Sequence, residues 1–136
     1  MQTISPHAAL VYVMVITSAA DGAMNDKELR AIGDITRNLP VFADYDQDKL
    51  IETARNCSAI LQDDDGLSAV LGLIKEALPD HLHETAYWLA LEVALVDGDV
   101  HVEEIRIVEA LRHTLGLERL ITAALERGAR ARFQRL

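Results

Sequence analysis

The sequence has little of the chemistry on which many small domains depend. Its 136 residues include one cysteine, Cys57, which excludes an internal disulfide and any zinc site built from cysteines. Aromatic residues make up 4% of the chain, and no segment alternates with period two, so strands are not expected. Nucleophile motifs, glycine-rich phosphate loops and HExxH are also missing. These absences favour a helical, non-catalytic protein in which Cys57 is a small buried hydrophobe.

Positive charge is scarce outside the last ten residues. The net charge is −9, but residues 127–136 contain four arginines and no acid. The rest of the chain has 9 basic and 22 acidic side chains, so it should repel nucleic acid and attract cations or basic partners. The arginine-rich tail has three interpretations: contact with an acidic partner, contact with a membrane surface, or a frayed, solvated helix end.

The N-terminal stretch carries no lysine or arginine ahead of its apolar run, so it lacks the charged region of a signal peptide. The run from 8 to 20 is also too short to span a bilayer. We therefore expect it to be a buried helix of a cytoplasmic protein.

Apolar residues recur with helical spacing in seven segments, which predicts an all-α fold in a single domain over residues 1–136. The predicted helices cover 6–20, 26–39, 46–62, 67–78, 81–96, 102–115 and 118–130. The segments 6–20 and 81–96 are apolar nearly all round, and such helices are enclosed by others in a globular domain. We expect these two at the centre of a bundle of about seven helices, with the five single-striped helices around them.

Two stretches, "SAADGAMNDKEL" and "ALVDGDVHVEEI", place Asp-Gly after an apolar run and Glu seven residues after that Asp. We call Asp21-Gly22 and Asp97-Gly98 the paired Asp-Gly turns. A glycine there suits the left-handed conformation that ends many helices. Glu28 and Glu104 then fall at the third position of the next helix, where each completes a capping box with Asn25 or His101. Since histidine caps poorly, the second box should be the weaker.

The repeat predicts an internal duplication with pseudo-twofold character. If successive helices reverse direction, segments 6–20 and 81–96 run parallel and both turns lie at one end of the domain. Five carboxylates would then share one face: Asp21, Glu28, Asp97, Asp99 and Glu104. Such oxygen-rich clusters suit hard cations such as calcium or magnesium. Docking of a basic partner, and turn chemistry with no further role, stay open as alternatives.

These two stretches resemble the TerB (tellurite resistance) family, and the resemblance covers most of residues 8–117. It implies an all-helical bundle with no established catalytic activity and an acidic cluster proposed to bind metal ions. It also implies protein partners in a membrane-associated stress-response complex, at the inner face of the inner membrane. The matching positions are Asp21, Glu28, Asp97 and Glu104. The two copies differ at the position where the first has Lys27 and the second has Glu103, so we do not expect equal metal affinity in both halves. Formation of a homodimer is a further open possibility.

Two further acidic features have alternatives of their own. Glu92 lies inside the apolar segment 81–96, where it is either paired with an arginine or at the solvent edge, or an acid catalyst with a neighbouring histidine. The run Asp63–Asp65 lacks the outer ligands of an EF-hand, so we predict a turn and an N-cap for the helix that follows.

Overall fold

The computed structural model describes residues 3–20, 24, 26–96, 98 and 100–136. These residues form seven α-helices and three short 3₁₀ helices and contain no strand, which confirms the predicted all-α fold. The elements are α1 (Pro6–Ser18), α2 (Asp26–Asn38), η1 (Pro40–Phe42), η2 (Gln47–Lys49), α3 (Leu50–Leu61), α4 (Gly66–Ala77), η3 (Asp80–Leu82), α5 (His83–Leu95), α6 (Val102–Leu115) and α7 (Arg119–Arg132).

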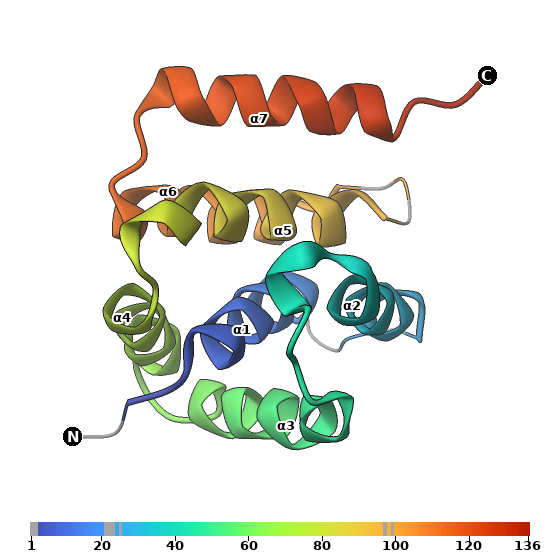
Figure 1. The fold of residues 1–136 in the computed structure, drawn as a ribbon. Helices are drawn as coiled ribbons and strands as arrows, with labels where there is room; N and C mark the ends of the chain where they lie inside the picture. The colour runs from blue at the N-terminus through green and yellow to red at the C-terminus, as the bar shows by residue number, and fades with distance from the viewer. Residues whose placement is uncertain (1–2, 21–23, 25, 97, 99) are drawn as a thin grey trace.

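The helix α1 lies inside the molecule, with α2, α3, α4 and α5 around it (Figure 1). Every residue from Ala9 to Ser18 is buried. This follows from the sequence, because a helix without a polar side has no face to turn to water. Its buried Thr17 hydroxyl donates to the carbonyl oxygen of Val13 at 2.8 Å, so its polar group is satisfied within the helix. In the described residues no helix combines the length and apolar character needed to cross a membrane.

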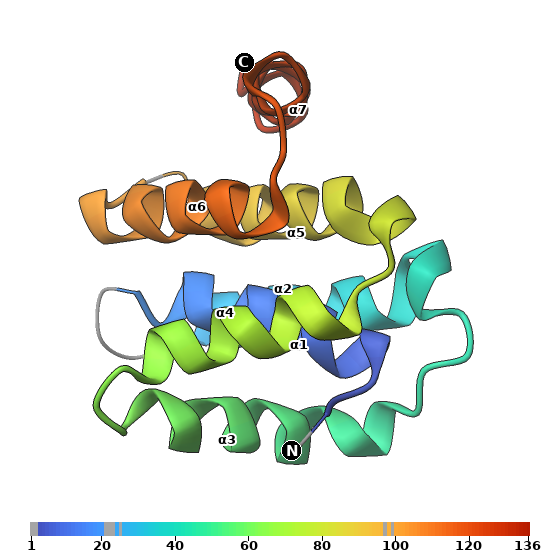
Figure 2. The ribbon, with the colours of Figure 1, turned by 90° about the vertical axis from the view of Figure 1, so that its left-hand side faces the viewer.

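The helix α5 packs against α1 on one side and α7 on the other (Figures 1 and 2). It is buried less completely than α1, since Trp88 and Glu92 are partly exposed. Of the residues of α7, Thr122 and Ala129 are buried, and Gly128 faces the Trp88 ring. The last helix is therefore an outer layer held to α5 by a narrow strip.

The helix ends follow the capping residues that the sequence supplies. Ser5 caps α1 by accepting a hydrogen bond from the Ala8 N–H at 3.0 Å. Gly116 ends α6 with φ of +66°, and Gly98 follows α5 with φ of +85°. The prediction of a turn and an N-cap at Asp63–Asp65 is confirmed in position. Asp65 holds the N-cap position with φ of +59°, and its side chain makes no capping bond.

Candidate functional sites

The parallel course of α1 and α5 places their C-terminal ends on the same side of the molecule, the left-hand side of Figure 2. The helices that follow, α2 and α6, begin on that side. Successive helices from α1 to α5 reverse direction, which is the condition under which both turns were expected at one end of the domain. The internal duplication itself stays a prediction.

Two of the five predicted ligand residues lie in the part of the chain that the structure describes. Glu28 and Glu104 stand in the first turns of α2 and α6 and are 5% and 3% exposed. Asp21, Asp97 and Asp99 lie outside the described residues, as does Asn25 of the first capping box. Within the described residues no group of three or more His, Cys, Asp or Glu side chains is placed to hold a metal ion.

Glu104 closes the second capping box. Its Oε1 accepts a hydrogen bond from the His101 N–H at 3.0 Å, with His101 at the N-cap of α6. A carboxylate in this position also interacts favourably with the positive end of the helix. The burial of Glu104 therefore has a structural reason, because its carboxylate closes the capping box of α6.

Glu92 is paired with an arginine, which confirms the first of the alternatives considered for it. The Nε of Arg132 donates to Glu92 Oε1 at 2.5 Å, and the Glu92 side chain is 16% exposed. The partner comes from the end of α7, two residues beyond the predicted end of that helix. The arginine-rich tail is thus tied to α5 through Arg132, although the Arg132 side chain remains 56% exposed to solvent.

Cys57 has the buried character expected of it. It lies on α3 with no exposed surface, and burial raises the pKa of its thiol to about 12. Because the thiolate is the reactive form, this cysteine is inert at neutral pH.

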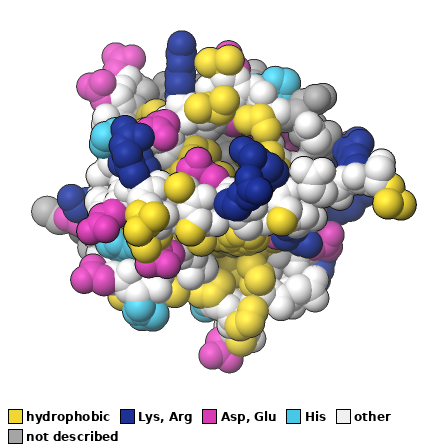
Figure 3. Space-filling view, turned by 90° about the horizontal axis from the view of Figure 1, so that it is seen from above, with side chains coloured by type: hydrophobic (Ala, Val, Ile, Leu, Met, Phe, Trp, Pro, Cys, Tyr) yellow, Lys and Arg dark blue, Asp and Glu magenta, His cyan; other side chains and the backbone are white. Residues whose placement is uncertain are grey.

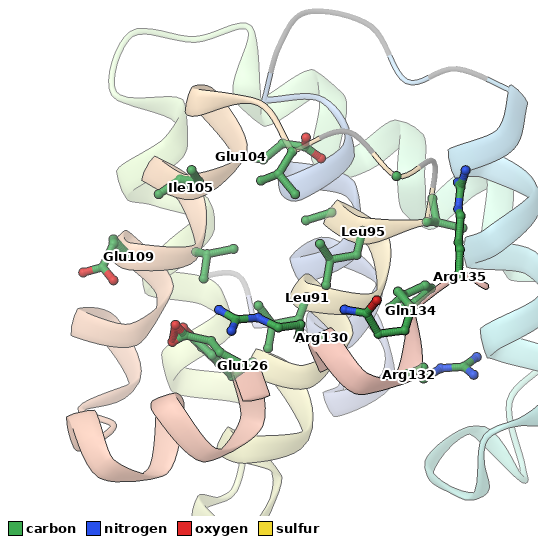
Figure 4. Close-up of a pocket in the computed structure, with 17 residues that line it drawn as sticks. Leu91, Leu95, Glu104, Ile105, Glu109, Glu126, Arg130, Arg132, Gln134 and Arg135 are labelled. Atoms are coloured by element: carbon green, nitrogen blue, oxygen red, sulfur yellow. The ribbon is translucent and has the colours of Figure 1, made fainter. Parts of the chain in front are cut away.

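A cleft of about 730 Å³ opens between α5, α6 and the second half of α7 (Figure 4). Viewed from the α7 side, the molecule shows hydrophobic side chains among arginines and acids on this face (Figure 3). Deep in the cleft, the Tyr87 hydroxyl donates to Glu126 Oε2 at 3.2 Å. Burial raises the pKa of Tyr87 well above its ordinary value, and the charge of Glu126 raises it further. The sequence did not indicate this cleft, because it depends on how α7 lies across α5.

Residues 7–126 match the family described as Tellurite resistance protein TerB. No curated protein and no solved structure shows a significant match.

Proposed function

The chain belongs to the TerB family of tellurite resistance proteins, and from this premise we propose that it is a non-catalytic acidic module that binds a divalent cation through the paired Asp-Gly turns. The observation that carries the proposal is the common side on which α1 and α5 end and α2 and α6 begin (Figure 2). This arrangement supports the expectation that the two similar acidic stretches share one end of the molecule.

The chemistry of the donors fits calcium or magnesium. The proposed ligands are Asp21, Glu28, Asp97, Asp99 and Glu104, all of which offer carboxylate oxygens. Pairs of exposed carboxylates about 4 Å apart repel by roughly 1 kcal/mol each, and a cation would relieve that repulsion. A helix corner stabilised by turn chemistry alone has no need of both copies at one end.

Calorimetric titration with calcium, magnesium and zinc tests the proposal most directly. We expect saturable heat with one hard cation and a stability gain of about 2.7 kcal/mol at one hundred times the dissociation constant. The double variant Asp21→Asn/Asp97→Asn should lose this gain and keep its helical circular dichroism. A matched control, Asp44→Asn/Asp64→Asn, makes the same charge change at exposed positions and should keep it. If both double variants respond like the parent, the aspartates are turn residues.

The alternative is an interaction module that uses the same acidic end without metal. Its partners would be basic proteins, in keeping with a membrane-associated stress complex at the cytoplasmic face of the inner membrane. A basic peptide that binds in EDTA and loses affinity in Asp21→Asn/Asp97→Asn would favour this alternative. The third candidate, an enzyme using Glu92, loses support because this carboxylate is engaged by Arg132.

A further inference from the structure

The cleft under α7 exists because α7 crosses α5 and leaves the α6 side of α5 open (Figure 4). Its volume of about 730 Å³ falls within the range of roughly 300–1,000 Å³ that small-molecule sites occupy. The Glu92–Arg132 ion pair and the Tyr87–Glu126 hydrogen bond hold α7 in this position. These two side-chain contacts between α5 and α7 therefore maintain the shape of the cleft.

Both walls of the cleft carry apolar side chains. Leu91 and Leu95 line it from α5, and Ile105 and Val108 line it from α6. Ile105 is 52% exposed, so the wall opens directly onto solvent. Covering such surface is favourable by about 25 cal/mol for each Å² removed from water. An alkyl chain laid between α5 and α6 would gain this energy.

The acidic side chains of the cleft are already engaged. Glu109 lies 3.4 Å from Arg112, Glu126 accepts from Tyr87, and Glu104 accepts from the His101 N–H. These carboxylates supply negative charge around the cavity, and they disfavour ligands that carry two or more negative charges.

The basic side chains are engaged unequally. Arg132 is paired with Glu92, and the Arg135 guanidinium lies against Gly98, where a Cβ would come within 2.7 Å of it. Arg130 forms no ion pair with any residue that the structure describes. Figure 4 shows its guanidinium extending into the cleft on the side of Glu126, a residue of the same helix. One cationic group therefore faces the cavity with its hydrogen-bond donors available.

We propose that this cleft binds a long-chain monocarboxylate such as a fatty acid. The carboxylate accepts hydrogen bonds from the Arg130 guanidinium, and the alkyl chain lies between Leu91 and Ile105. A single negative charge matches Arg130, the arginine that extends into the cleft, whereas a phosphate dianion would be repelled by the surrounding carboxylates. Glu104 lines this cleft and is also one of the proposed cation ligands, but the contacts proposed here are made by Arg130, Leu91 and Ile105, so they do not require a bound cation.

The probe is laurate, titrated in EDTA below the concentration at which it aggregates, and followed by calorimetry and amide NMR shifts. EDTA removes divalent cations, so failure here and failure of the cation proposal are distinguishable. We expect saturable binding that strengthens by about fourfold for each methylene between octanoate and laurate. Arg130→Gln should weaken it about tenfold, as the loss of one charge-assisted hydrogen bond does. Arg127→Gln, on the same helix but outside the cleft, should leave it unchanged.

A second pair of variants, one in the apolar wall and one outside the cleft, tests the contact with the alkyl chain. Ile105→Asp places a charge in the wall and should abolish laurate binding, whereas Ile51→Asp, at a position 61% exposed outside the cleft, should not. Circular dichroism confirms that each variant is folded. Equal affinities for Arg130→Gln and Arg127→Gln, no saturable binding, or binding to anionic vesicles without binding to monomeric laurate would each overturn the proposal.

Discussion

The close approach of α3 to α4 leaves no room for a side chain at Gly66, so replacing this glycine should measurably destabilise the protein. Gly66 is the first residue of α4, and it is buried against the last turn of α3. A Cβ at this position would lie 2.3 Å from the carbonyl oxygen of Ile60 and 2.8 Å from Cα of Leu61. Both are backbone atoms, so they cannot rotate away as a flexible side chain can. Gly66→Ala must therefore move one helix against the other.

The expected cost follows from that geometry. Forcing one methyl group into a packed interior costs about 1–3 kcal/mol, and backbone atoms on the receiving side favour the upper part of this range. We expect Gly66→Ala to lower the free energy of unfolding by about 3 kcal/mol. That is a large part of the free energy of unfolding of an ordinary domain, which is about 5–15 kcal/mol.

Gly72, in the middle of the same helix, is the matched control. No heavy atom lies within 4 Å of its Cβ position. Gly72→Ala should therefore stabilise the protein by about 1 kcal/mol, the difference in helix propensity between the two residues. The same substitution thus has opposite signs six residues apart. Urea unfolding followed by far-ultraviolet circular dichroism measures both, provided the denaturant slope stays constant. If the two variants shift stability equally, or if Gly66→Ala is neutral, the close packing of α3 on α4 is wrong.

Three further predictions each concern one residue or one residue pair. The Cys57 thiol stays neutral in the folded protein up to about pH 12, whereas its ordinary pKa is 9.0, so the unfolded chain loses this proton first. Stability should fall as pH rises above about 9, by up to 1.4 kcal/mol per unit from this group, and Cys57→Ala should show a shallower decline in alkaline urea titrations. A double-mutant cycle on Glu92→Gln and Arg132→Gln should give a coupling of about 0.5–1 kcal/mol, because the Arg132 side chain is 56% exposed; a value of zero would remove this tie between α5 and α7. Ser5→Ala should cost about 1 kcal/mol in thermal melts through the lost cap of α1, and an unchanged melt would contradict that cap.

The helices were largely predictable because their signals are local. The spacing of apolar residues and the flanking prolines and glycines act within a few residues of each boundary. Thus α6 ends at Leu115 with Gly116 in the left-handed conformation, as expected. The segments 46–62 and 81–96 were predicted as uniform helices, but each begins with a 3₁₀ turn, η2 or η3. Helical periodicity does not separate 3₁₀ from α in the first three residues of a segment, so this detail was lost.

The candidate sites depended more on tertiary contacts. Glu28 and Glu104 were identified from their spacing after Asp-Gly, since a capping box is a relation between neighbours in sequence. The partner of Glu92 was foreseen as an arginine, but its identity was not. Arg132 lies forty residues further along the chain and reaches Glu92 because α7 crosses α5. For the same reason the arginine-rich tail could not be placed from its composition.

By itself, the sequence determined that the chain is all-helical, that the segment of α1 is buried, and that two acidic capping segments recur. These properties follow from periodicity, all-round apolarity and short-range hydrogen bonding, which hold wherever the helices finally lie. Only the tertiary structure decided that α7 packs on α5 and leaves a cleft beside α6, and that Arg130 faces into it. These features rest on contacts between residues far apart in the sequence, such as Arg132 with Glu92, which no local pattern specifies.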